Sequence, residues 1–162
     1  MPNPYDDLRD IQKHWKKLVQ QNIAPVAGHK NISFFHDTVG ELDCDRWIYI
    51  KEQNDRPIAI ATLVHWSDLD GVIVLDLGYA VDPDFRTQGF AQNISQVAFS
   101  DIENHLDPCP ARWFIEASVD VDNAVSQAIA SKLLENYQCR RINPQTERES
   151  VIYRKEFRRD VR

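Results

Sequence analysis

Glycine and cysteine are scarce in this chain of 162 residues, which also has no long apolar run. Neither G-x-G-x-x-G nor the P-loop pattern G-x-x-x-x-G-K-[ST] occurs, which excludes both nucleotide-binding fingerprints. The cysteines number three, Cys44, Cys109 and Cys139, and this odd, widely spaced set argues against a disulfide framework and favours a cytoplasmic location. Because no apolar run approaches the roughly 20 residues of a membrane span, no membrane association is expected. The polar start MPNPYDDLRDIQKHWKK also lacks the apolar stretch of a secretory signal.

Positive charge is also in short supply. Lys and Arg number 19 against 25 Asp and Glu, so the formal net charge is −6. This balance argues against a nucleic-acid partner, because phosphate backbones are bound by clustered Lys and Arg. A small anionic ligand stays compatible with it, since backbone dipoles and one arginine can hold such a ligand. The cysteines and histidines show no metal-ligand spacing, so no metal is expected.

Hydrophobic residues, at 43% of the chain, follow periodic patterns that predict one globular domain over residues 1–162. An amphipathic helix is predicted over residues 4–21. Alternation over 46–52 and an apolar run over 57–65, with turn residues between them, predict a β-hairpin. Residues 72–81 read as a buried strand.

The second half of the chain alternates between the hydrophobic periodicity of helices and that of strands. Helical spacing predicts a helix over residues 88–106, and a strand is expected over 112–119. A further helix begins after a cap at Asp122 or Asn123, and 149–157 reads as a closing strand. Helices that alternate with strands in the middle of the chain predict an α/β or α+β fold around one mixed sheet.

The stretch VDPDFRTQGFAQ, residues 81–92, joins the predicted strand 72–81 to the helix that follows it. In such a strand–loop–helix unit, unpaired backbone N–H groups and the helix dipole form an anion site. Gly89 lets a phosphate approach the backbone, and Arg86 supplies a positive charge. The alternative is that Gly89 only makes the turn, because strand-to-helix turns often contain a glycine.

The residues in this stretch resemble a known family. Arg86-Thr87-Gln88-Gly89-Phe90-Ala91 is similar to the [QR]-x-x-G-x-[GA] pyrophosphate loop of the GCN5-related N-acetyltransferases. The preceding DLGYAVDP, residues 76–83, resembles strand 4 of the branch that contains the ribosomal-protein N-terminal acetyltransferases. FIEA at 114–117 and NAVSQ at 123–127 resemble strand 5 and the N-x-x-S helix start of that branch. The resemblance covers about residues 44–135.

This resemblance implies a mixed, centrally splayed β-sheet with helices on both faces, and acetyl-CoA as co-substrate. The implied reaction is direct attack on the thioester, in a ternary complex, by a primary amine on a protein N-terminus or a small molecule. The resemblance is also compatible with a homodimer, because pairing through terminal strands is common in the family. The residues implied to bind the cofactor are Tyr79, Ala80, Val81, Arg86, Thr87, Gln88, Gly89, Phe90, Ala91, Asn123 and Ser126.

The acid of the reaction departs from the family pattern. Many relatives carry a tyrosine seven residues after the asparagine, where this chain has Ala130. Ser126 is therefore the candidate donor to the leaving thiolate, and the alternative is a helix-start serine that satisfies its own backbone. Leu134-Glu135 also replaces the usual Gly-Phe. These departures motivate a second hypothesis, a non-catalytic CoA-binding sensor or partner-binding module.

Two carboxylates are candidates for the base. Asp76 and Glu116 lie on the strands that the family splays apart, and burial can raise a carboxyl pKa into the useful range. The alternative for Glu116 is a structural salt bridge with Arg112. His65 has a suitable intrinsic pKa, although a histidine at a strand end is more often an ordinary surface residue.

Overall fold

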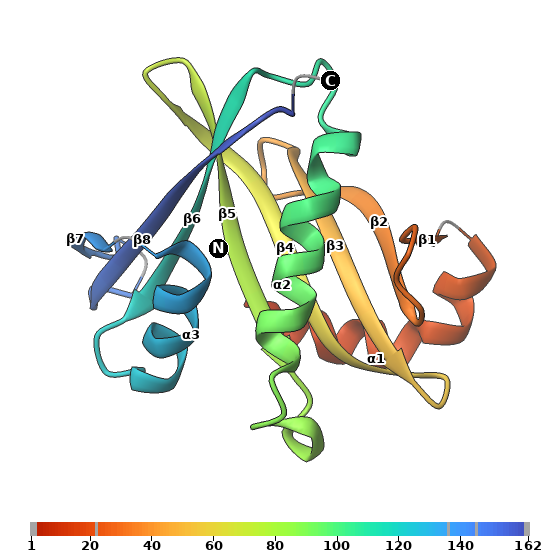
Figure 1. Ribbon diagram of the computed structural model, residues 1–162. Coiled ribbons are helices and arrows are strands. Elements are labelled where there is room, and N and C mark those ends of the chain that lie inside the picture. The colour runs from red at the N-terminus through yellow and green to blue at the C-terminus, as the bar shows by residue number, and fades with distance from the viewer. Residues whose placement is uncertain (1–2, 22, 136, 145, 161–162) are drawn as a thin grey trace. The chain divides into compact units, whose positions relative to one another are not determined.

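The computed structural model describes residues 3–21, 23–135, 137–144 and 146–160, and within them the strands form one mixed sheet (Figure 1). The strand order is β1-β2-β3-β4-β5-β6-β8-β7. The strands are β1 (Ala24–Pro25), β2 (Ile32–Val39), β3 (Cys44–Gln53), β4 (Arg56–Leu69), β5 (Val72–Val81), β6 (Arg112–Asp120), β7 (Tyr137–Ile142) and β8 (Glu149–Arg158). The helices are α1 (Pro4–Gln21), α2 (Phe90–Asp101) and α3 (Ala124–Leu134), with 3₁₀ turns η1 (Pro83–Phe85) and η2 (Ile102–His105). The chain divides into two compact units, Met1–Val64 with Gly78–His105, and His65–Leu77 with Leu106–Arg162.

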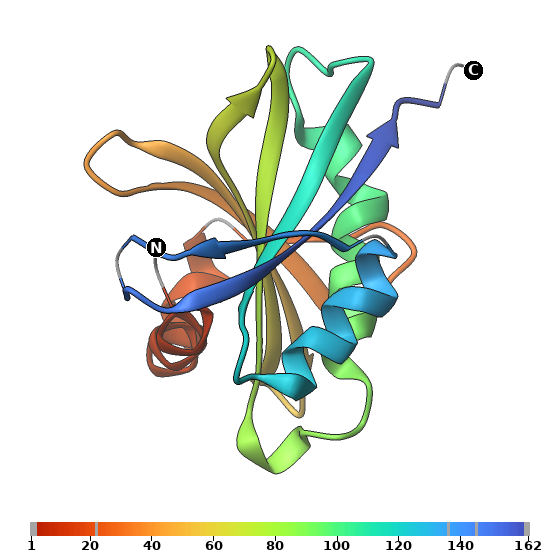
Figure 2. The ribbon, with the colours of Figure 1, turned by 90° about the vertical axis from the view of Figure 1, so that its left-hand side faces the viewer.

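In the first unit, α1 and α2 cover opposite faces of the strands (Figures 1 and 2). The apolar stripe of α1 is buried because successive strand side chains alternate between the two faces, so every second residue meets the helix. The core on the α1 face consists of Leu8, Ile11, Trp15, Ile48, Ile50, Ile60 and Ala80. The predicted helix over residues 4–21 is therefore confirmed. Leu8, Ile11 and Trp15 are its buried residues, whereas Val19, expected on the same apolar stripe, is exposed.

The hairpin between β3 and β4 forms where the sequence predicts it. Asn54 and Asp55 both have positive φ, 52° and 58°, as a two-residue turn matched to the strand twist requires. The strand after this turn is longer than predicted, because β4 continues past residue 65 to Leu69. The next turn is reduced to Asp70 and Gly71, again both with positive φ.

The helix predicted over residues 88–106 is shorter at both ends. It begins at Phe90, because Gly89 has a left-handed φ of 79° and cannot extend the helix backwards. After Asp101 the chain tightens into η2. At this end Asp101 accepts hydrogen bonds from Tyr49 Oη at 3.1 Å and pairs with His105 Nε2 at 2.7 Å. Burial, with the Asp101 charge nearby, raises the pKa of Tyr49.

The second unit contains the parallel pair β5–β6 and the antiparallel pairs β6–β8 and β7–β8. Helix α3 packs on β6 and β8. Its N-cap is Asn123, one of the two caps that the sequence leaves open, and the Asn123 Oδ1 accepts from Ser126 N–H at 3.1 Å. Among the helices of the described residues, none has both the length and the apolar character to cross a membrane.

Gly78 in β5 lies where the first turn of α1 crosses the strand. A Cβ at this position would lie 2.5 Å from Pro4 Cγ and 2.7 Å from Thr62 Oγ1. We expect Gly78→Ala to lower the free energy of unfolding by about 1–3 kcal/mol, the usual cost of overpacking. Urea denaturation measures the loss, and adding Pro4→Ala should recover part of it. An unchanged midpoint in Gly78→Ala would contradict this packing.

Candidate functional site

The loop over residues 86–91 joins the end of β5, through η1, to the first turn of α2. Residues 86–89 are exposed, whereas Ala91 is buried in the helix. Thr87 and Gly89 both have positive φ, 64° and 79°. A β-branched residue such as Thr87 rarely adopts this conformation, and backbone strain of this kind concentrates at functional sites.

Backbone donors gather at the start of α2. Gly89 is the N-cap and offers no side chain to bond the first-turn N–H groups, and the first turn contains no acidic residue. These N–H groups therefore combine with the positive end of the helix dipole. A Cβ placed on Gly89 would meet nothing within 4 Å, so the backbone is open to approach. The arrangement suits a phosphate or another anion.

Arg86 is the first residue of this loop, and its side chain contacts residues that precede the loop in the chain. Its Nε donates to the Val81 carbonyl oxygen at 3.4 Å, and its guanidinium lies 5.5 Å from the centre of the Tyr5 ring. Both contacts are weak, and the side chain is exposed. Arg86 therefore places a positive charge at the loop, and among the residues that the structure describes it has no ion-pair partner.

Strand β5 pairs with β6 in the second unit. The two strands pair at Val74–Phe114, Leu75–Ile115 and Asp76–Glu116. Tyr79, Ala80 and Val81, which the resemblance assigns to cofactor binding, belong to the first unit. Their role as backbone contacts stays a prediction.

Asp76 and Glu116 are register partners on the two parallel strands. Burial of Asp76, reinforced by the nearby negative charge of Glu116, raises the Asp76 pKa from 3.8 to about 7, against the opposing charges of Arg141 and Arg154. No hydrogen-bond donor contacts the Asp76 carboxyl among the described residues. A carboxyl with this pKa exchanges a proton near neutral pH.

Glu116, in contrast, is occupied by arginines. Both Arg154 Nε, at 2.8 Å, and Arg154 Nη2 donate to Glu116 Oε2, and Arg141 Nη1 lies 3.7 Å from Oε1. Glu116 therefore forms a salt bridge, but the predicted partner, Arg112, is wrong. Arg112 Nη1 lies 3.4 Å from Glu156 Oε2 instead. Of the two carboxylates, Asp76 is the better suited to accept a proton.

The other predicted residues have local roles in the structure. Asn123 caps α3 through its bond to the Ser126 N–H, and contacts of Asn123 and Ser126 with a cofactor stay predictions. His65 Nε2 pairs with Asp68 at 2.8 Å within the last part of β4. Within the described residues, no group of three or more His, Cys, Asp or Glu is placed to hold a metal ion.

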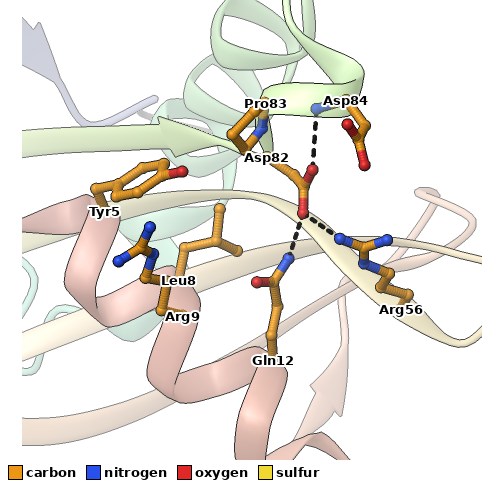
Figure 3. Close-up of a pocket in the computed structure, with 8 residues that line it drawn as sticks. All are labelled: Tyr5, Leu8, Arg9, Gln12, Arg56, Asp82, Pro83 and Asp84. Atoms are coloured by element: carbon orange, nitrogen blue, oxygen red, sulfur yellow. Dashed lines mark hydrogen bonds and ion pairs between the residues drawn. The ribbon is translucent and has the colours of Figure 1, made fainter.

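A hydrogen-bond network around Asp82 was not predicted from the sequence (Figure 3). The Asp82 carboxylate is buried, and it accepts from Gln12 Nε2 at 2.7 Å and Arg56 Nη2 at 2.6 Å, and from Asp84 N–H at 3.0 Å. Although burial opposes it, these bonds hold the pKa of Asp82 below its usual value. The Asp82-Pro83 pair after a strand is a signal for the cap, but nothing local indicates Gln12 or Arg56. A hollow of about 220 Å³ beside the network is lined by Tyr5, Leu8, Arg9, Gln12, Arg56, Asp82, Pro83 and Asp84.

The sequence matches no family model and no curated protein, but the structure has clear neighbours. One is the ribosomal L7/L12 alpha-N-protein acetyltransferase RimL in complex with coenzyme A, with a TM-score of 0.53 and 16% identity over 68% of this chain and 61% of that one. Another is a GNAT-family acetyltransferase from Streptococcus pneumoniae, with a TM-score of 0.51 and 12% identity over 68% and 66%. The ribosomal-protein-S18-alanine N-acetyltransferase from Escherichia coli has a TM-score of 0.50 and 21% identity over 76% and 74%.

These neighbours show the fold. The chain has the fold of the GCN5-related N-acetyltransferases, a mixed sheet flanked by helices, so the fold class predicted from the sequence is confirmed. The chain spans 61% and 66% of the length of the first two of these neighbours.

Proposed function

We propose that this protein is an N-acetyltransferase that transfers an acetyl group from acetyl-CoA to a primary amine, on a protein N-terminus or a small molecule. The observation that carries the proposal is the open 86–91 loop at the start of α2, with Thr87 and Gly89 in the left-handed region. The fold supports it, because structures with this fold include an acetyltransferase in complex with coenzyme A.

The loop is proposed to hold the diphosphate of acetyl-CoA. Backbone N–H groups of residues 87–91 donate to the phosphate oxygens, and Arg86 turns toward them from its weak contact with Val81. The backbone of residues 79–81 is proposed to pair with the pantetheine arm as an added strand would. The Val81 N–H then donates to the thioester oxygen, where negative charge develops during attack.

Asp76 is the proposed base. The acceptor enters as an ammonium ion, and it loses a proton before its nitrogen forms the new C–N bond and the C–S bond breaks. Water between the acceptor and Asp76 is proposed to carry this proton to its carboxylate. The new amide nitrogen gives up its second proton as the C–S bond breaks, and the leaving thiolate takes up one proton. Ser126 is the candidate that donates to the thiolate and regains its own proton from the one released by the nitrogen.

Binding of acetyl-CoA tests this function directly. At a concentration of 100 Kd, acetyl-CoA should stabilise the protein by about 2.7 kcal/mol, which raises the melting temperature by about 5–10 °C for a chain of this size. Pantetheine, which lacks the diphosphate, should give no comparable rise. No rise at millimolar acetyl-CoA would remove the proposal.

Thiol release then separates an enzyme from a binding module. Peptides with a free N-terminus and small primary amines should release CoA thiol from acetyl-CoA, and the same peptides with a blocked N-terminus should not. Binding of acetyl-CoA without thiol release from any amine would favour the non-catalytic module.

A further inference from the structure

Asp82 stands at the junction between β5 and the chain that leads to the 86–91 loop. Its backbone N–H donates to the Ile58 carbonyl oxygen at 2.8 Å, which continues the pairing of β5 one residue beyond its end. Its side chain then caps η1 through the Asp84 N–H. The chain therefore changes direction at a residue that is fixed through both its backbone and its side chain.

The second carboxylate oxygen of Asp82 links this junction to two other elements. Gln12 reaches it from α1 and Arg56 from the start of β4 (Figure 3). Gln12 Nε2 also donates to the Pro57 carbonyl oxygen at 2.9 Å, which fixes the amide itself. Three segments far apart in sequence thus converge on one side chain that is 5% exposed.

The charge of this carboxylate is balanced where it lies. A lone buried carboxylate near an anion-binding loop would repel phosphate and would be costly to bury. Arg56 neutralises it at 2.6 Å, while more than half of the Arg56 side chain stays exposed. The network therefore provides rigidity without adding net negative charge.

We propose that Asp82 is the positioning residue of the acetyl-CoA site, which fixes the path from β5 to the 86–91 loop and so orients the loop donors that hold the diphosphate. This inference rests on the proposed function. Asp82 is proposed to act through the backbone on either side of it, and it is not a catalytic residue.

Asp82→Asn is the sharpest variant. The asparagine Oδ1 can still accept from Asp84 N–H, but the new NH₂ group faces two donors, Gln12 and Arg56. The variant therefore breaks the links to α1 and β4 and spares the cap. Asp37→Asn is the control in the same unit, because it removes the carboxylate that binds Arg46 at 2.8 and 2.6 Å away from this junction.

Two measurements test the role of Asp82, hydrogen exchange of the free protein and the KM for acetyl-CoA. Hydrogen exchange of the Phe85 amide, which donates to the Asp82 carbonyl oxygen at 2.9 Å, should become faster in Asp82→Asn and stay unchanged in Asp37→Asn. The KM for acetyl-CoA should rise about tenfold in Asp82→Asn, as for the loss of one charge-assisted bond, with kcat within about threefold of the wild type. Asp37→Asn should keep the KM of the wild type. If Asp82→Asn does not fold, Gln12→Met, which removes one donor, carries the test with a KM rise of about threefold.

The outcomes separate the two proposals. A wild-type protein that does not bind acetyl-CoA ends the proposed function and this inference with it. A wild-type enzyme whose Asp82→Asn variant keeps both the KM for acetyl-CoA and the exchange rate of the Phe85 amide overturns this inference alone. An equal KM rise in Asp37→Asn would also overturn it, because the effect would then be one of general stability.

Discussion

Asp76→Asn should lower kcat about 100-fold at pH 8, the lower end of what a general base contributes. The variant keeps the shape of the side chain and removes its ability to accept a proton. In the wild type, activity should rise with pH through the Asp76 pKa of about 7 and level off above it, because the base works only when it is ionised. The variant should lose this rise. Initial rates of thiol release between pH 5.5 and 9 measure both effects.

Glu116→Gln is the matched control for this base. Removing the Glu116 charge takes away one cause of the raised Asp76 pKa and leaves Arg141 and Arg154 to favour the ionised carboxyl. The acid limb of the pH profile should therefore move to lower pH while the plateau of kcat is retained. If Glu116→Gln is the inactive variant and Asp76→Asn keeps the wild-type profile, then Glu116 is the base and the assignment to Asp76 is wrong.

Asp76→Asn, which should lower activity, should raise the stability of the folded protein. The folded protein holds the Asp76 proton more tightly than the unfolded chain, so its stability falls as pH rises from about 4 to about 7 and stays lowered above that. A pKa displaced from 3.8 to about 7 corresponds to at most about 4 kcal/mol. Asp76→Asn should therefore be more stable than the wild type at pH 8 and gain little at pH 4. Urea denaturation at the two pH values measures the difference, and an equal or lower stability at pH 8 would contradict it.

The sequence predicts those parts of the fold that depend on neighbouring residues. Residues 4–21 and 72–81 form the predicted helix and strand with the predicted bounds, because each carries a full periodic pattern. The hairpin at Asn54-Asp55 follows from local turn chemistry. The sequence also places Gly89 near the junction of strand 72–81 and the next helix, but the predicted helix over 88–106 includes this residue, whereas its left-handed φ makes it the N-cap of α2.

Contacts between distant segments could not be predicted in this way. The sequence analysis offers Arg112 as a salt-bridge partner of Glu116, but four residues along a strand separate Cα atoms by about 13 Å. The actual partner, Arg154, is the register partner of Glu116 across β6 and β8. The bond from Gln12 to Asp82 spans 70 residues, so only the folded chain brings the two together.

Gly89→Ala should weaken binding of acetyl-CoA about tenfold or more, because its Cβ would occupy space that the diphosphate needs for close approach to the backbone. In the free protein this Cβ would meet nothing within 4 Å, so the cost to folding is that of the φ of 79° alone, about 1 kcal/mol. Loss of affinity beyond the loss of stability therefore reports contact with the ligand.

Gly28 offers a closely matched control for this variant. It has the same φ of 79°, and a Cβ there would also meet nothing within 4 Å. Gly28→Ala should cost the same stability, about 1 kcal/mol, and leave the affinity unchanged, because Gly28 lies between β1 and β2 at the edge of the sheet, whereas the 86–91 loop follows β5. Isothermal titration of CoA into both variants, with urea denaturation alongside, separates strain from binding. If the two variants bind CoA equally well, the backbone at Gly89 does not meet the diphosphate, and the anion site must be sought elsewhere on the chain.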